Sequence, residues 1–383
     1  MNNFIYQNPV KIVFGKGQIA KLPELIDANK TILMTYGGGS IKKNGVYDQV
    51  KKALAGRKLL EFGGIEPNPR YETLMKAAEV CKKEGVSFLL SVGGGSVLDG
   101  TKFIALAANY KAGDPWDILA KQATANEAIP LGCIITLPAT GSEMNSGFVI
   151  SRESTKEKLA SGNPLVYPLF SILDPETTFT LSKEQTANGI VDAFVHVMEQ
   201  YMTYPVYTPL QDRQSEAIFL TLIEKVPKMM EYPQDYNARA AIMWTATQAL
   251  NGLIACGVPQ DWTTHMIGHE LTAFYGLDHA KTLAIVLPGI LRHQLKNKEK
   301  KLLQYGQRVW KINPTKSDAT LKAIDKTEKF FRSVGIKTKL SEYGIGKEKF
   351  SEIADRFRRR GMRLGEHQAI GSEQVIEILN LCL

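Results

Sequence analysis

The first half of the chain alternates short β-prone apolar runs with segments of helical spacing. The apolar runs cover residues 30–36, 87–92, 129–137 and 169–173. The segments 41–54 and 97–108, which follow the first two runs, have the spacing of helices. Continuous apolar strands separated by helices are typical of a parallel sheet that is covered on both faces. The pattern therefore predicts an α/β domain with a Rossmann-like parallel sheet.

The second half of the chain has mostly helical spacing. Ser182 followed by Gln185 matches a capping box, in which a serine side chain accepts a hydrogen bond from the backbone three residues later. No segment after Asp174 has the pattern of a strand. We therefore expect an α/β dinucleotide-binding domain over residues 1–180 and an all-α metal-binding domain over residues 181–383.

Two glycine-rich segments of identical sequence, GGGS, end two of the predicted strands at residues 37–40 and 93–96. A strand-to-helix turn offers free backbone N–H groups and the positive end of a helix dipole, and glycine lets a phosphate approach the backbone. Neither segment has the G-x-G-x-x-G spacing of the common dinucleotide fingerprint. Either loop alone is as compatible with a simple tight turn. Two such loops favour a dinucleotide, which has a pyrophosphate and an outer ribose to hold.

Charges near the first loop bear on the choice between NADP and NAD. Lys42 and Lys43 follow Ser40, and lysine suits a phosphate. An acidic residue at a strand tip would instead bind the ribose hydroxyls and repel a 2′-phosphate. Glu61 is a rival ribose partner, but it lies within an apolar run. The lysines favour NADP, with ordinary surface charges as the alternative.

Ligand-type residues recur at helical spacing in the second half. Asp192 and His196 are four residues apart, as are His265 and His269, and His279 follows. One carboxylate with imidazoles is a suitable donor set for Fe²⁺ or Zn²⁺. A lone histidine is more often a core residue, but two such pairs favour a metal site. The spacing alone leaves open which three histidines bind, and His265 is not followed by the glutamate of a zinc-protease motif.

Composition limits the class of protein. Of 383 residues, 44% are apolar and 22% are charged, which is typical of a globular protein with a large core. The net charge of +8 leaves a nucleic-acid-binding module as an alternative, although no basic reader motif is present. The densest basic run, at residues 356–363, is expected to be a solvated helix face. His293 and His367 have no ligand-type neighbours at useful spacing and are assigned to no site.

The expected location is the cytoplasm. The four cysteines do not have the spacing of a disulfide framework, and we expect them to be reduced thiols. The N-terminus has no signal-peptide pattern, and no apolar run is long enough to cross a membrane.

Several longer motifs are more specific than these patterns. They are FGKG at 14–17, YGGGS at 36–40, GGIEPNP at 63–69, VGGGSVLDGTK at 92–102, TLPATGSE at 136–143, ANGIVDAFVHVMEQY at 187–201 and GHELTAFYGLDHA at 268–280. Together they run along nearly the whole chain. On these motifs the chain resembles the iron-containing alcohol dehydrogenase family, in particular its NADPH-dependent aldehyde reductases and butanol dehydrogenases.

The resemblance implies specific site residues. The metal ligands would be Asp192, His196, His265 and His279, and His269 would lie beside the substrate as the catalytic residue. The implied cofactor contacts are Gly38, Gly39, Ser40, Asn68, Gly94, Gly95, Ser96, Asp99, Thr136, Leu137, Thr140, Lys158 and Leu181. Glycine at position 39, where NAD-dependent members tend to have aspartate, implies NADP(H), with NAD(H) also possible.

The expected function is metal-dependent hydride transfer between NADP(H) and a small aldehyde or primary alcohol, with one Fe²⁺ or Zn²⁺. The family also implies a homodimer, and we expect neither a nucleic-acid nor a membrane partner. Trp244, Trp262 and Phe148 are candidate apolar walls of the substrate site or, equally, core residues. The main alternative is an NAD-dependent lyase resembling dehydroquinate synthase, which would recycle its cofactor within each turnover.

Overall fold

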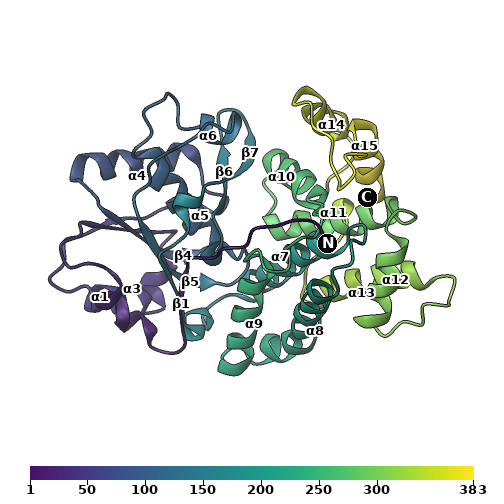
Figure 1. The fold of residues 1–383 in the computed structure, drawn as a ribbon, viewed down its shortest axis with the longest axis horizontal. Coiled ribbons are helices and arrows are strands. Elements are labelled where there is room, and N and C mark those ends of the chain that lie inside the picture. Colours follow the sequence, from purple (N-terminus) through teal and green to yellow (C-terminus); the bar gives the residue numbers. More distant parts are fainter. The chain divides into compact units, whose positions relative to one another are not determined.

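The computed structural model describes all of residues 1–383 and divides the chain into two compact units (Figure 1). The sheet unit comprises Gln7–Leu181 and Glu231–Thr247, and the helical unit comprises Met1–Tyr6, Ser182–Met230 and Gln248–Leu383. No helix is both long and apolar enough to cross a lipid bilayer.

The sheet unit is built on a six-stranded parallel sheet of order β1-β8-β5-β4-β2-β3. Its strands are β1 (Lys11–Phe14), β2 (Ile32–Tyr36), β3 (Leu59–Phe62), β4 (Phe88–Gly94), β5 (Leu131–Leu137) and β8 (Phe170–Leu173). The four predicted apolar runs are confirmed as β2, β4, β5 and β8. The sequence pattern missed the edge strands β1 and β3, which are short and only partly buried.

Helices cover both faces of this sheet (Figure 1). On one face lie α4 (Tyr71–Glu84) and α5 (Gly95–Ala107), which pack on a layer that includes Leu33 and Leu89. The other layer includes Ile32, Met34 and Leu90, and it packs against η1 (Gln18–Lys21), α1 (Leu22–Leu25), α2 (Ser40–Lys43) and α3 (Val46–Ala53). Successive residues of a strand thus enter opposite cores, which is why apolar residues predominate on both faces of the central strands.

The remaining elements of the sheet unit are short, apart from one helix. An antiparallel hairpin, β6 (Gly147–Arg152) and β7 (Glu157–Gly162), was not predicted from the sequence. The other elements are α6 (Asp117–Ala120), η2 (Ser142–Met144), η3 (Pro164–Val166), η4 (Pro175–Thr178) and most of α9 (Tyr236–Ala249).

The single helix predicted over residues 41–54 was wrong. The structure has two helices, α2 and α3, separated at Gly45, whose φ of +79° is outside the helical region. The second glycine segment also differs from the expected turn, because β4 continues through Gly94 and α5 begins at Gly95. The change from strand to helix is therefore immediate.

The helical unit contains no strand, as the sequence predicted. Its helices are α7 (Lys183–Tyr201), α8 (Pro209–Glu231), α10 (Thr263–Tyr275), α11 (His279–His293), α12 (Glu299–Arg308), α13 (Ala319–Ser333), α14 (Phe350–Arg359) and α15 (Ser372–Leu381), with the turn η5 (Leu340–Tyr343). The predicted cap of α7 is confirmed, since the side chain of Ser182 accepts from the Gln185 backbone N–H at 3.1 Å. Apolar residues of α10, α11, α14 and α15 form one core cluster.

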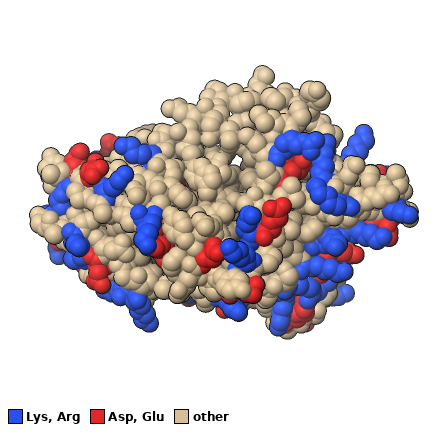
Figure 2. Space-filling model, turned by 90° about the horizontal axis from the view of Figure 1, so that it is seen from below, with Lys and Arg blue, Asp and Glu red and all other residues tan.

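The prediction that the basic run at residues 356–363 is a solvated helix face is correct for Arg358 and wrong for Arg356 and Arg360. Arg356 and Arg360 donate to the buried carboxylate of Glu270 on α10, at 2.9 and 2.5 Å. A buried carboxylate is stable only when such partners replace its hydration. On the face drawn in Figure 2, acidic side chains lie among the basic ones.

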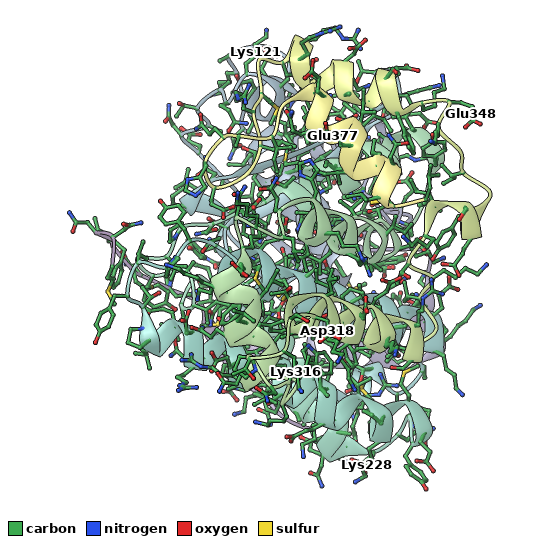
Figure 3. The ribbon with its side chains drawn as sticks, turned by 90° about the vertical axis from the view of Figure 1, so that its right-hand side faces the viewer. Lys121, Lys228, Lys316, Asp318, Glu348 and Glu377 are labelled. Atoms are coloured by element: carbon green, nitrogen blue, oxygen red, sulfur yellow. The ribbon has the colours of Figure 1, made fainter.

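His293 and His367 do have partners in the structure. His293 Nε2 lies 2.7 Å from the carboxylate of Glu377, a residue of α15. Glu377 is labelled in Figure 3. The ring of His367 stacks on that of Tyr204, with 4.6 Å between their centroids. Both histidines have structural contacts here, in keeping with their assignment to no metal site.

Candidate metal and dinucleotide sites

The two glycine loops lie side by side at the carboxyl edge of the sheet. β2 and β4 are neighbours, with Tyr36 opposite Val92, although β3 lies between them in sequence. From β2 the chain first adds β3 on the outer side and then crosses back to β4. Such a reversal leaves a crevice at the carboxyl ends of the two strands, where ligands of open α/β sheets bind. The segments after Tyr36 and Val92 are the two predicted loops.

The second loop approaches the end of β5 so closely that a side chain is excluded. A Cβ on Gly95 would lie 2.4 Å from both Oγ1 and Cγ2 of Thr140. Gly94 pairs with Leu137, the last residue of β5. The structure thus brings Gly94, Gly95, Leu137 and Thr140 together, beside the first turn of α5, where backbone N–H groups are available to an anion.

Other predicted cofactor residues occupy defined positions in the same unit. Lys158 on β7 donates to Asn68 Oδ1 at 2.7 Å. Asp99 on α5 accepts from Ser142 Oγ at 2.7 Å and from the Val149 N–H at 3.0 Å. The rest of the set stands at Gly38 and Gly39 before α2, Ser40 at its first residue, Ser96 within α5, Thr136 within β5, and Leu181 at the end of a segment of the sheet unit.

The charges beside the first loop are arranged around two tyrosines. Lys42 Nζ lies 5.0 Å from the ring centroids of both Tyr36 and Tyr47. Glu61 lies within the apolar strand β3, as expected, and its Oε1 accepts from Tyr47 Oη at 2.7 Å and Lys51 Nζ at 3.1 Å. The carboxylate near this loop is therefore already bound to donors of its own domain.

The candidate metal ligands come from three helices of the helical unit. Asp192 and His196 lie one turn apart on α7, His265 is in the first turn of α10, and His279 begins α11. Asp192 Oδ1 is 3.6 Å from His196 Nε2, 3.9 Å from His265 Nε2 and 3.7 Å from His279 Nε2. Ligand atoms of Asp192, His265 and His279 all lie within 4.8 Å of one another. The His196 ring stacks on that of His265, 4.8 Å away.

These separations fit ligands of one shared ion. They are too long for hydrogen bonds, and two ligands about 2.1 Å from one ion at tetrahedral angles lie roughly 3.4 Å apart. Asp192 Oδ1 is buried and has no hydrogen-bond donor. An unsatisfied buried carboxylate oxygen is costly unless a cation balances it. One carboxylate with three imidazoles therefore suits a divalent transition metal.

His269 is close to the four candidate ligands but is not one of them. It lies one turn after His265 on α10 and is buried, with its ring centroid 5.3 Å from that of His279. Trp262 packs edge-on against the His265 ring at 5.3 Å. The other candidate wall residues belong to the sheet unit, where Phe148 is in the core and Trp244 contacts Phe14.

Sequence patterns missed Glu199, which contacts His265. Its Oε2 meets His265 Nδ1, and its Oε1 accepts from the backbone N–H groups of Thr264 and His265. The available signal was its spacing, because Glu199 is three residues after His196 and seven after Asp192 on one helix face.

Comparison with known proteins supports the same assignment. Residues 9–175 match the model of the iron-containing alcohol dehydrogenase family, and residues 186–383 match the C-terminal model of the Fe-containing alcohol dehydrogenase family. The chain is 55% identical over 376 residues to the NADPH-dependent aldehyde reductase YqhD of Escherichia coli (strain K12), covering 97% of each protein. It is 44% identical over 389 residues to the "Probable NADH-dependent butanol dehydrogenase 1" of Bacillus subtilis (strain 168), covering 100% of each.

Structural comparison gives the same result. The crystal structure of E. coli K-12 YqhD is 52% identical in sequence and superposes with a TM-score of 0.98, covering 100% of this chain and 99% of that one. Both family models, the whole-length relatives and the fold agree. The chain belongs to the iron-containing alcohol dehydrogenase family.

Proposed function

We propose that this chain is a metal-dependent oxidoreductase that transfers hydride between NADP(H) and a small aldehyde or primary alcohol. The observation that carries the proposal is the convergence of Asp192 Oδ1 with Nε2 atoms of three histidines, in a chain that also has two glycine loops at a sheet switch point. Residues 1–180 would bind the dinucleotide and residues 181–383 would hold the metal. The chain would act as a cytoplasmic homodimer.

The proposed metal ligands are Asp192, His196, His265 and His279, and the ion is Fe²⁺ or Zn²⁺. When bound, the metal supplies a Lewis acid that polarises the carbonyl oxygen, and the reduced dinucleotide supplies the hydride. Asp192, His196 and His265 are buried and His279 is partly exposed, and together they fix the position of that charge within the helical unit. Preorganised charge of this kind stabilises negative charge that develops on the substrate oxygen.

The loops of the sheet unit would hold the dinucleotide. The first turn of α5, with Gly94, Gly95 and Ser96, is the proposed pyrophosphate site, because the first N–H groups of a helix are available to an anion. Gly38, Gly39 and Ser40 would receive the adenosine ribose, and Lys158 and Asn68 of the same unit are further proposed cofactor contacts. The further proposed contacts are Asp99, Thr136, Leu137, Thr140 and Leu181.

His269 is the proposed proton-transfer group. It is buried one helical turn from His265, so it can hold a proton close to the substrate oxygen without ligating the ion. Water or a ribose hydroxyl are alternative proton sources.

The proposal is tested by following NADPH and NADH oxidation with butanal, using chelator-treated enzyme before and after addition of Zn²⁺ or Fe²⁺. We expect metal-restored oxidation that is faster with NADPH than with NADH. Faster oxidation of NADH would keep the enzyme class and overturn the cofactor preference. The lyase alternative is not favoured, since the relatives are named reductases and dehydrogenases, and net consumption of NADPH would exclude it.

The preference for NADP(H) makes a second prediction. Gly39→Asp is expected to lower the ratio of kcat/KM with NADPH to kcat/KM with NADH by at least about tenfold, because a carboxylate repels the 2′-phosphate and binds the ribose hydroxyls. Gly39 has φ +93°, so any side chain there adds strain. Gly39→Asn is the matched control, as it adds similar bulk and strain without charge. An equal change in both variants would show that charge at this position does not select the cofactor.

A further inference from the structure

Glu199 joins two helices that carry proposed metal ligands. It lies on α7 one turn after His196, and only 3% of its surface is exposed. Its Oε1 accepts from the backbone N–H of Thr264 at 2.6 Å and from that of His265 at 3.2 Å. Its Oε2 contacts Nδ1 of the His265 ring. Both oxygens of one buried carboxylate are thus used at the start of α10.

The contact with Nδ1 determines how His265 presents its other nitrogen. A carboxylate at Nδ1 places the ring proton there, which leaves the lone pair on Nε2. His265 Nε2 is the atom 3.9 Å from Asp192 Oδ1. A carboxylate hydrogen-bonded to a ligating histidine fixes its tautomer and orientation and makes the ligand nitrogen more basic.

The two backbone hydrogen bonds fix the helix on which His265 stands. The first N–H groups of a helix have no partner within the helix, and the side chain of Trp262 at the N-cap supplies none. Glu199 supplies an acceptor for these groups from α7. The Glu199 carbonyl also accepts from the Asp261 N–H at 2.9 Å. The ring and the backbone of His265 are therefore held by the same residue.

We infer that Glu199 is a positioning residue of the metal site, which orients His265 and raises the affinity of the site for a divalent ion. The inference rests on the proposed function only in taking Asp192 and the three histidines as metal ligands. Glu199 itself does not ligate the ion, because its two oxygens are directed to Nδ1 and to the helix start.

The test measures Zn²⁺ affinity of the metal-stripped full chain by competition with a chromophoric chelator. Glu199→Gln is expected to weaken Zn²⁺ binding by about 10- to 100-fold, because the amide loses the charge and replaces one acceptor oxygen with a donor. Glu199→Asp keeps the charge on a shorter side chain and is expected to lose less affinity. If the glutamine variant folds poorly, Glu199→Asp still allows the inference to be tested.

Glu216→Gln is the matched control. Glu216 is another buried carboxylate of the helical unit, bound by Tyr201 and Arg308 rather than by a histidine. Its replacement is expected to lower thermal stability and leave Zn²⁺ affinity within about twofold of the original chain. Nitrogen NMR of ¹⁵N-histidine-labelled, metal-free protein gives an independent readout. The His265 signal should report a proton on Nδ1 in the original chain and a mixed tautomer in Glu199→Gln.

The outcomes separate the inference from the proposed function. If the original chain binds Zn²⁺ and both Glu199 variants bind it equally tightly, Glu199 has no positioning role and the metal site stands. If Glu216→Gln weakens binding as much as Glu199→Gln, the effect comes from general destabilisation, and the inference is wrong. If the original chain fails to bind Zn²⁺ or Fe²⁺, the proposed metal site and the inference fail together.

Discussion

Replacing His196 with alanine is expected to remove bound metal and to lower kcat for butanal reduction by about a thousandfold. The ring of His196 supplies the Nε2 atom 3.6 Å from Asp192 Oδ1 and stacks on His265, so its loss opens one side of the ligand set. A metal ion acting as Lewis acid contributes several kcal/mol to stabilisation of the transition state, and each 1.36 kcal/mol is a factor of ten in rate. Metal content by elemental analysis and turnover with NADPH are the two measurements. His265→Ala should behave in the same way.

His293→Ala is the matched control for this experiment. His293 is also at a helix end of the same unit, but its partner is Glu377 on α15. The variant should keep its metal and its turnover. Normal turnover of metal-free His196→Ala would show that the cluster is not the catalytic centre.

Replacing Lys102 with methionine is expected to lower the free energy of unfolding by about 3 kcal/mol or more. Lys102 is fully buried on α5, and its Nζ donates to the carbonyl oxygens of Ser142, Asn145 and Gly147 at 2.7–2.9 Å. Methionine has similar volume but no donor, and each buried acceptor left unsatisfied costs about 1–3 kcal/mol. Urea denaturation measures the loss. Lys121→Met is the control. Lys121, which is labelled in Figure 3, is exposed and pairs with Asp117, so this substitution should cost at most about 0.5 kcal/mol.

The pH dependence of the same variant gives a second check. Burial lowers the pKa of Lys102 to about 8, below its ordinary value of 10.5. Between these values the unfolded chain binds the proton and the folded chain releases it, so this lysine makes the protein more stable as pH rises from about 8 towards 10.5. The stability difference between the original chain and Lys102→Met should therefore widen over that interval. A constant difference would show that the pKa of Lys102 is not lowered by folding.

Much of the fold was predictable because its sequence signals are local. The four strands β2, β4, β5 and β8 are mostly apolar on both faces, since both faces of the sheet are buried. The cap at Ser182 and the absence of strands after β8 were also predicted. The edge strands β1 and β3 were missed because four partly buried residues produce no clear period. The hairpin of β6 and β7 was missed as well. The helix predicted over residues 41–54 is interrupted at Gly45.

The candidate metal site was also predictable in part. Helical spacing placed Asp192 with His196 and His265 with His269, because residues four apart share a helix face. Spacing could not show which three of the four histidines lie around Asp192, since that depends on how α7, α10 and α11 are placed relative to one another. The structure gathers three of them around Asp192 Oδ1 and leaves His269 beside the group.

The α/β and all-α halves, the glycine loops and the ligand-type residues could be predicted without the structure, because these features follow from residue type and short-range periodicity. The three-dimensional fold was needed to show that Gly37–Ser40 and Gly93–Ser96 are neighbours, because strand order is set by long-range pairing of β2 with β4. Only the tertiary structure brought Glu199 to His265 and Glu270 to Arg356 and Arg360. A buried charge is stable only with partners, and these partners come from segments far apart in the chain.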